Sequence, residues 1–250
     1  MMAISEKLQA ARIVSLPNDA YYIPNFITEE EEDQFLRKIS HAPLPRWTQL
    51  THRRLQTWPS SLTKTNTLLS AALPPWLTYP VIEPKFTELG IFAESPHAAP
   101  NHVLINEYRP GQGIMPHEDG PAYYPLVATV SLGAPIVLDI YDKKLESAGE
   151  DGDARERVDR AQVRFRILQE PRSLLVTRGE MYTGYLHGIA EKVADEDLGP
   201  DTICNWDLLG VRDGFARGSY ERATRTSLTY RDVLKVAKMG NALKVLGGKT

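Results

Sequence analysis

The sequence has few of the features that mark an extracellular or membrane-spanning protein. It contains a single cysteine, Cys204, which excludes an intramolecular disulfide and fits a reducing compartment. No apolar run approaches the length that spans a bilayer, and the first residues lack the apolar core of a signal peptide. We therefore expect a protein of the cell interior, in the cytoplasm and the nucleus, that has no membrane partner.

The chain also has little excess of charge of either sign. Its formal net charge is -3 and its pI is near 6.1, so the molecule as a whole does not attract a polyanion. A nucleic-acid partner would therefore need a local basic patch. The 250 residues, 42% of them hydrophobic, suit one domain with a sizeable core. We expect a monomer with a loosely ordered N-terminus at residues 1–20 and a single domain at residues 21–250.

Short runs of β-branched and aromatic residues, separated by Gly and Pro turns, predict a mainly β fold. Two such runs, residues 127–132 and 135–141, flank a Gly-Ala-Pro turn and predict a β-hairpin. The mixed-charge residues 143–162 contain few apolar side chains, so we expect them to form a mobile surface loop.

Two helices are predicted near the ends of the chain. Thr28 and Glu31 have the spacing of a capping box, so a helix is expected to begin after Thr28. Phe35 and Ile39 then fall on one apolar stripe. Apolar residues at helical spacing, with lysines opposite, predict a second helix in residues 232–250.

The most informative stretch is NEYRPGQGIMPHED, at residues 106–119. It ends in His117-x-Asp119, and side chains two residues apart in an extended segment lie on the same side. His187 in GYLHGI is the candidate for a second imidazole, and two histidines with one carboxylate suit non-heme Fe(II). His-x-Asp alone arises by chance, most often as a turn histidine and a surface aspartate. The Pro-Gly-x-Gly turn just before it, which places His117 where a loop becomes a strand, favours the metal site.

Polar residues on two other strand-like runs indicate what else this site binds. Asn106 and Tyr108 are two residues apart, and Arg225 and Arg231 are six apart, so each pair lies on one face of its strand. An arginine fork binds a carboxylate with two parallel hydrogen bonds. The combination predicts a site for Fe(II) and a small dicarboxylate.

The motifs NEYxPGxGIxPHED, LHGI and RxSLTYRDV resemble the AlkB family of Fe(II)- and 2-oxoglutarate-dependent dioxygenases, with the AlkB homologue 6 branch as the nearest match that they suggest. The similarity covers most of the chain, from Tyr21 to Val233, and its motif set is specific. It implies that iron is bound by His117, Asp119 and His187. It implies that 2-oxoglutarate is bound by Asn106, Tyr108, Arg225 and Arg231.

This chain departs from the family pattern in two places. Many members have Asn two residues after the first arginine, where this chain has Ser227. A hydroxyl still donates one hydrogen bond, so we count Ser227 among the 2-oxoglutarate residues. The spacing from His187 to Arg225 is also longer than in the smaller members, which implies an inserted loop.

Residues 41–60, HAPLPRWTQLTHRRLQTWPS, are the candidate substrate lid. Aromatic rings can stack on bases, and guanidinium groups beside them can contact phosphates. The candidate residues are Trp47, Arg53, Arg54 and Trp58. A structural loop with buried tryptophans and solvated arginines is an equally good interpretation of the residues alone. In the AlkB family this position is a nucleotide-recognition lid, which favours the substrate role. Tyr123 and Tyr124 follow Asp119 closely and line the substrate side of the iron pocket or serve as packing residues.

The resemblance implies a mainly β (α+β) fold, a double-stranded β-helix or jelly roll with N-terminal and C-terminal helices. It also implies that Fe(II) and O2 oxidatively decarboxylate 2-oxoglutarate and hydroxylate a C–H bond of the substrate. We predict oxidative demethylation of alkylated nucleic acid, RNA or DNA. Two alternatives stay open: a nucleic-acid or protein binding module on the same scaffold, and a protein side-chain hydroxylase.

Overall fold

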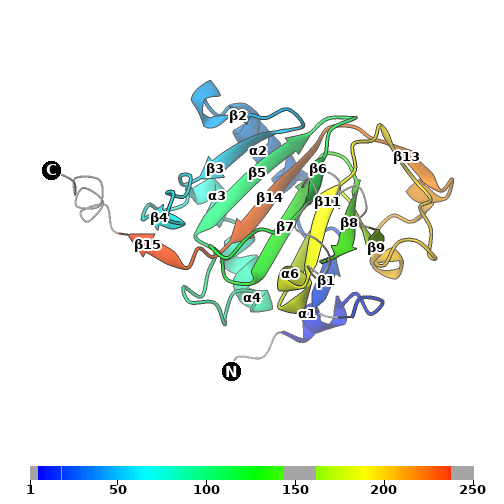
Figure 1. Ribbon diagram of the computed structural model, residues 1–250, viewed down its shortest axis with the longest axis horizontal. Helices are drawn as coiled ribbons and strands as arrows, with labels where there is room; N and C mark the ends of the chain where they lie inside the picture. The colour runs from blue at the N-terminus through cyan, green and yellow to red at the C-terminus, as the bar shows by residue number, and fades with distance from the viewer. Residues whose placement is uncertain (1–4, 18, 144–161, 238–250) are drawn as a thin grey trace, which may run out of the picture.

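The structure is a computed structural model that describes residues 5–17, 19–143 and 162–237. Two antiparallel sheets face each other at its centre (Figure 1). In spatial order, the large sheet consists of β1 (Ala20–Ile23), β10 (Leu174–Arg178), β7 (Leu126–Leu132), β14 (Arg225–Arg231), β5 (His102–Tyr108), β3 (Arg54–Trp58) and β2 (Thr48–Gln49). The small sheet consists of β6 (Ile114–His117), β11 (Tyr185–Ile189), β8 (Ile136–Asp142) and β9 (Val163–Gln169). The prediction of a mainly β fold is confirmed.

The strands of the large sheet separate two environments, because successive side chains in a strand point to opposite faces. On β14, Arg225 lines a cavity between the sheets, while Leu228 packs into a hydrophobic cluster on the other side. On β5, Asn106 lines the same cavity and Ile105 joins the same cluster. We call these two sides the cavity face and the outer face of the large sheet.

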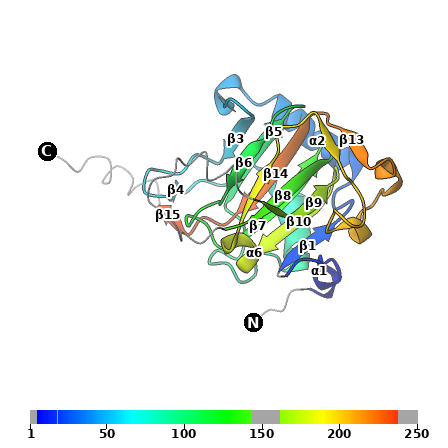
Figure 2. The ribbon, with the colours of Figure 1, turned by 45° about the vertical axis from the view of Figure 1, so that its right-hand side comes forward.

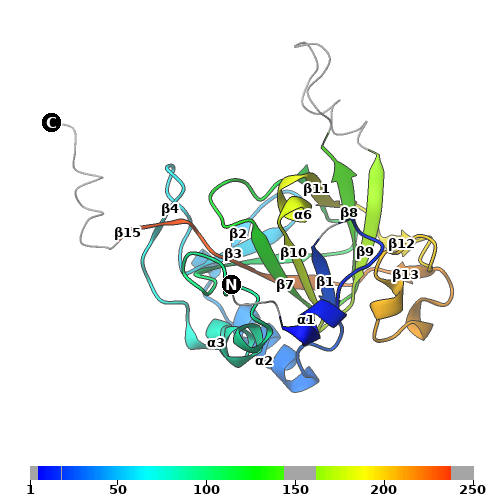
Figure 3. The same cartoon turned by 90° about the horizontal axis from the view of Figure 1, so that it is seen from below.

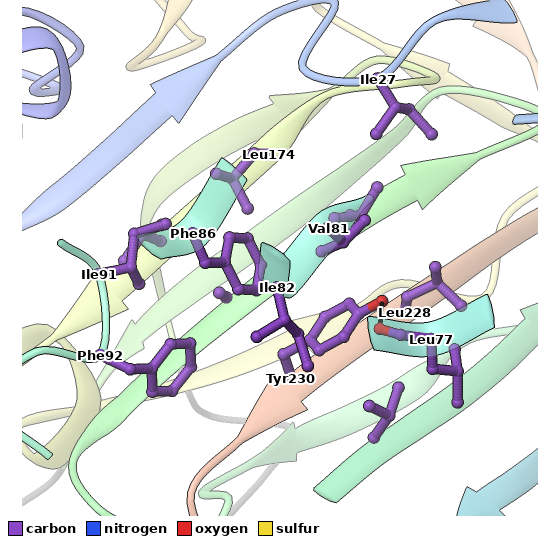
Figure 4. Close-up of a cluster of buried hydrophobic side chains, with 14 of the residues drawn as sticks. Ile27, Leu77, Val81, Ile82, Phe86, Ile91, Phe92, Leu174, Leu228 and Tyr230 are labelled. Carbon is purple, nitrogen blue, oxygen red and sulfur yellow. Dashed lines mark hydrogen bonds between the residues drawn. The ribbon is translucent and has the colours of Figure 1, made fainter. Parts of the chain in front are cut away.

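Short helices cover the outer face: α2 (Glu29–Ser40), α3 (Pro75–Thr78), η2 (Val81–Phe86) and α4 (Thr87–Leu89). Figure 3 shows α2 and α3 on one side of β7 and β10, and β11 on the other. The hydroxyl of Tyr230 on β14 donates to the carbonyl of Leu77 at 3.1 Å, and its ring meets Phe86 edge to face at 5.2 Å (Figure 4). This packing anchors β14 and thereby fixes the residues on its cavity face.

The N-terminal end of α2 shows why that helix begins where it does. The Thr28 hydroxyl accepts from the backbone N–H of Glu31 at 3.2 Å, and the Glu31 carboxylate accepts from the N–H of Thr28 at 2.9 Å. These two bonds satisfy donors that the helix itself leaves unpaired, so the predicted capping box is confirmed. Phe35 and Ile39 are buried on the predicted apolar stripe.

Residues 5–17, 19 and 20 differ from the loosely ordered stretch that was expected of residues 1–20, while residues 1–4 and 18 lie outside the described residues. α1 (Glu6–Ala10) and the residues after it bury Leu8, Ile13 and Leu16, each 1% exposed. The N–H of Ile13 donates to the carbonyl of Ala20 at 2.9 Å, which ties the segment to β1. The burial of three apolar side chains in so short a stretch holds the segment against the core, although its sequence gives little indication of a helix.

The predicted hairpin of β7 and β8 is wrong, because β7 belongs to the large sheet and β8 to the small one. The chain crosses between the sheets at Gly133, whose φ of +81° suits glycine. Its N–H donates to the carboxylate of Glu32 on α2 at 2.7 Å. Both strands are buried on both faces, so their residue pattern does not reveal which sheet each one joins.

The C-terminal end also differs from its prediction. β15 (Lys235–Ala237) pairs in parallel with β4 (Thr67–Leu69), so the predicted helix is wrong for these residues. Residues 238–250 of that helix, and residues 144–161 of the predicted surface loop, lie outside the described residues. No helix within the described ranges is long and apolar enough to cross a membrane.

The remaining elements are short and lie around the sandwich. They are η1 (Leu44–Arg46), α6 (Glu180–Thr183), β12 (Ala194–Glu196), η3 (Trp206–Leu208), η4 (Asp213–Phe215) and β13 (Ser219–Glu221). β13 lies at the opposite end of the molecule from β4 and β15 (Figures 1 and 2).

Candidate active site

Two strands of the small sheet bring the candidate metal ligands together. His117 ends β6 and faces His187 on β11 as a direct cross-strand pair, with ring centroids 4.4 Å apart. Asp119 follows two residues after His117. One ligand atom from each of the three residues lies within 4.8 Å of the others. The group predicted from the sequence therefore converges in space, with two imidazoles and one carboxylate able to hold a single metal ion.

Burial favours the neutral form of both histidines, which is the form that a metal requires. Burial lowers the pKa of His187 to about 4, although the charge of Asp119 opposes the shift. Burial also lowers the pKa of His117, with smaller opposing contributions from the Met115 backbone and Asp119. Nδ1 of His117 lies 2.9 Å from the carbonyl of Met115, and a donor at Nδ1 leaves Nε2 free to bind a metal.

Asp119 is held in its charged form by an arginine of the large sheet. Burial, the largest single influence, would raise the pKa of this carboxyl, but Arg231, His187 and His117 together lower it below its ordinary value. Nη2 of Arg231 donates a hydrogen bond to Oδ1 of Asp119. The side chains of this ion pair are 9% and 5% exposed, so water screens it little.

A cavity of 280 Å³ opens between the two sheets at the metal group. All three candidate metal ligands line it. The five residues predicted to bind 2-oxoglutarate also line it, and these are Asn106, Tyr108, Arg225, Ser227 and Arg231. The structure thus collects both predicted sets around one space, with the metal ligands on the small-sheet side and the others on β5 and β14.

Arg225 is a buried cation without an acidic partner among the described residues. Its side chain donates through Nη2 to Ser131 Oγ at 3.0 Å and to Gln169 Oε1 at 3.2 Å. Its Nε has no hydrogen-bond partner, and burial lowers its pKa to about 10. A charged guanidinium that no acid balances fits the carboxylate of a bound ligand. This orphaned donor is the structural observation that agrees with a dicarboxylate co-substrate.

Sequence reasoning did not identify Ser131 and Gln169 as parts of the site. Ser131 lies on β7 and Gln169 ends β9, and they are 0% and 2% exposed. Each is a polar residue in the buried part of its strand, next to apolar neighbours. That is a weak signal, because strands distant in the sequence must first be placed side by side.

The two adjacent arginines of the candidate lid face opposite sides of the large sheet. Arg53 lines the cavity, and its Nε donates to Asn106 Oδ1 at 3.2 Å. Arg54 points to the outer face, where it donates two hydrogen bonds of 2.7 Å to the carboxylate of Glu107. Its Cζ lies 4.0 Å from the ring centroid of Trp47. Arg53 is therefore the lid cation that reaches the candidate active site.

The tryptophans of the lid lie on the outer face, away from the cavity. Trp47 and Trp58 both pack against the hydrophobic cluster beneath the large sheet. Trp58 also donates through Nε1 to Gln56 at 3.0 Å and meets Trp76 edge to face at 5.7 Å. In this conformation the structure does not bring either ring to the candidate metal group.

The two tyrosines after Asp119 also take separate places. Tyr123 lies beside the site, where the Cζ of Arg231 is 4.8 Å from its ring centroid. Tyr124 packs against the hydrophobic cluster on the outer face. The structure therefore places Tyr123 near the metal group and Tyr124 in the packing position that the sequence left as an alternative.

Comparisons with known proteins agree with this geometry. A family model described as the 2OG-Fe(II) oxygenase superfamily matches residues 19–231. A protein of Danio rerio named "Probable RNA/DNA demethylase ALKBH6" is 39% identical over 222 residues, which cover 89% of this chain and 88% of the relative.

Two solved structures share the fold. The structure of OsALKBH1 has a TM-score of 0.52 at 13% identity and covers 87% of this chain and 99% of its own. An oxidoreductase of the 2OG-Fe(II) oxygenase family from Burkholderia pseudomallei has a TM-score of 0.52 at 11% identity, with coverages of 94% and 98%. At such low identities, these two likenesses concern the architecture.

Proposed function

Since this chain belongs to the 2OG-Fe(II) oxygenase superfamily, we propose that it oxidatively removes alkyl groups from RNA or DNA. The family uses Fe(II), 2-oxoglutarate and O2. The observation that carries the proposal is one cavity lined both by a candidate metal-binding group and by the two arginines of β14. The nucleic-acid substrate is supported by the relative that is 39% identical, which is named as a probable RNA/DNA demethylase.

His117, Asp119 and His187 would hold the iron. When bound, Fe(II) with 2-oxoglutarate and O2 supplies the oxidising chemistry that hydroxylates a C–H bond. The protein contributes the orientation of the ligands. A neutral imidazole has a nitrogen lone pair that can bind the metal without first losing a proton. The hydrogen bond from Arg231 favours the charged form of Asp119 and holds its carboxylate next to the two histidines.

Arg225 and Arg231 would address opposite ends of 2-oxoglutarate. Six residues along β14 separate their Cα atoms by about 20 Å, and the side chains extend inward from there. Arg231 lies at the metal end, because it contacts Asp119. Arg225 lies at the far end, where Tyr108 is its cross-strand partner and Asn106 is on the same face of β5. The distal carboxylate of the co-substrate would therefore bind at Arg225.

Arg53 would connect the substrate to this site. It is the cation of the lid segment that lines the cavity, and it already contacts Asn106. A phosphate or a base placed over the cavity would meet this guanidinium first. Because the net charge of the chain is -3, we infer that such local contacts account for nucleic-acid binding.

The test is the formation of succinate and formaldehyde from 2-oxoglutarate and N-methylated RNA or DNA oligonucleotides, with Fe(II), ascorbate and O2. We expect turnover that is stimulated by the oligonucleotide and that is lost in His117→Ala, which should also bind Fe(II) less tightly. Unchanged Fe(II) binding in His117→Ala would contradict the proposed metal site. Stimulation by a protein extract, but by no oligonucleotide, would instead indicate a side-chain hydroxylase.

A further inference from the structure

A closed group of three polar side chains lies at the end of the cavity away from the metal ligands. Arg225 donates to Ser131 Oγ at 3.0 Å and to Gln169 Oε1 at 3.2 Å, and the Ser131 hydroxyl donates to the same Gln169 oxygen at 3.3 Å. The three residues come from β14, β7 and β9, so the group bridges both sheets. None of them is more than 3% exposed.

The acceptors that Arg225 uses are neutral, unlike those of its neighbours. Arg222 forms a buried, two-fold hydrogen-bonded pair with Asp195, at 2.9 and 2.6 Å. Arg231 pairs with Asp119. Arg225 is held instead by an amide and a hydroxyl, and within residues 5–17, 19–143 and 162–237 it forms no ion pair. A carboxylate in place of the amide of Gln169 would bind the guanidinium more strongly. Because the protein places no carboxylate there, the charge of Arg225 is available to a ligand.

We propose that Gln169 and Ser131 are positioning residues that aim Arg225 without neutralising it, so that the protein selects 2-oxo acids with a distal carboxylate. The inference rests on the proposed use of Arg225 for 2-oxoglutarate. The two neutral acceptors fix the plane of the guanidinium through Nη2. Nε, which has no partner, is left for the ligand. The carboxylate of the co-substrate then supplies the charge that the protein omits.

The charge and the burial of Arg225 support this proposal. The pKa of Arg225, at about 10, keeps the guanidinium charged at neutral pH in spite of its burial. A buried charge that lacks a partner is unfavourable in the free protein, and a bound carboxylate removes that penalty. Binding of the dicarboxylate should therefore stabilise the fold strongly, whereas a 2-oxo acid with one carboxylate should not.

The experiment compares Gln169→Glu with the matched neutral variant Gln169→Leu. Both lose the amide, and Glu alone introduces a carboxylate next to Arg225. Affinities for 2-oxoglutarate and for 2-oxopentanoate, which lacks the distal carboxylate, are measured by calorimetry with Mn(II) in place of iron. We expect Gln169→Glu to weaken 2-oxoglutarate at least about tenfold, because an internal carboxylate competes for the guanidinium, and to leave 2-oxopentanoate within about twofold.

Thermal unfolding without ligand supplies a second readout that moves in the opposite direction. Gln169→Glu should melt at a higher temperature than Gln169→Leu, because its carboxylate balances the charge of Arg225. Ser131→Ala, which removes the other neutral acceptor, should weaken 2-oxoglutarate about threefold to tenfold and spare 2-oxopentanoate. This variant carries the test if Gln169→Glu does not fold.

The outcomes separate this inference from the proposed function. Equal affinity of wild type and Gln169→Glu for 2-oxoglutarate, or an equal loss for both acids, would overturn the positioning role. A wild-type protein that binds neither acid would instead contradict the assigned co-substrate site itself.

Discussion

Nε of Arg53 donates a hydrogen bond to Oδ1 of Asn106 at 3.2 Å, which joins the segment before β3 to the cavity face of β5. The next residue, Arg54, pairs with Glu107 on the outer face. Two adjacent arginines thus belong to two different parts of the molecule. The first contacts the candidate co-substrate pocket, and the second ties the lid to the sheet.

Substitution of these arginines should therefore have different effects. Arg53→Ala removes the partner of Asn106, so we expect 2-oxoglutarate affinity to fall about threefold to tenfold. Arg54→Ala should leave that affinity unchanged and lower the free energy of unfolding by about 1 kcal/mol, as for a partly exposed ion pair. Calorimetry and urea denaturation measure the two effects. Equal losses of 2-oxoglutarate affinity in both variants would contradict the separation.

The same pair predicts how nucleic-acid binding depends on salt. Arg54 is already occupied by Glu107, whereas Arg53 lines the open cavity. Arg53→Ala should reduce the slope of log affinity against log salt concentration by about one, and Arg54→Ala should leave it unchanged. Fluorescence anisotropy of a labelled oligonucleotide at several salt concentrations measures this slope. A change of slope in Arg54→Ala alone would contradict the prediction, because it would show that Arg54, and not Arg53, contacts the phosphate.

The ion pair of Asp119 and Arg231 should stabilise the metal-free protein. Asp119→Ala leaves a buried guanidinium without its acid, which should lower the free energy of unfolding by about 3–5 kcal/mol. The double variant Asp119→Ala/Arg231→Met removes both charges and should recover part of that loss. Denaturation in the presence of a chelator measures both variants. A double variant less stable than Asp119→Ala would show that the charge of Arg231 is balanced by another group.

His102 should make the stability of the fold depend on pH. It is 2% exposed, and burial, then Arg231, lowers its pKa from 6.5 to about 4, with the Ser60 backbone opposing. The unfolded chain therefore binds a proton at a higher pH than the native protein. Stability from this residue is complete above pH 6.5 and is lost as the pH falls to about 4, by up to about 3 kcal/mol.

His102→Leu removes this contribution and should flatten the dependence of unfolding free energy on pH between 6.5 and about 4. The other titrating groups are the same in both proteins, so the difference between the two pH profiles isolates His102. Parallel profiles for wild type and variant would contradict this prediction, because they would mean that His102 has the same pKa in the native and the unfolded protein.

Gly113 should be essential to the alignment of the metal ligands. A Cβ at this position would lie 2.2 Å from the carbonyl oxygen of Ile189 on β11. Gly113→Ala must therefore push β6 away from β11 and separate His117 from His187. We expect metal affinity to fall about 10-fold to 100-fold, as it does when groups that orient ligands are lost. In the control Gly199→Ala no atom lies within 4 Å of the new Cβ, so metal affinity should not change.

The sequence was sufficient to predict which side chains meet around the cavity as candidate metal ligands and candidate 2-oxoglutarate residues. Residues two or six apart on an extended run share a face by local geometry alone. His117 and Asp119, like Arg225 and Arg231, follow that rule. The capping box at Thr28 is local in the same sense, since its two bonds join residues three apart.

Long-range packing decided everything that depends on which strands become neighbours. The partition of β7 and β8 between two sheets, and the parallel pairing of β15 with β4, left no local signal. Gln169 reaches Arg225 because β9 and β14 face each other across the sandwich. Local periodicity tells which residues share a face, and the tertiary structure decides whether that face meets the cavity, as for Arg53, or the outer layer, as for Trp58. Side-chain direction is fixed within a few residues of chain, whereas strand neighbours are chosen by the burial of the whole core.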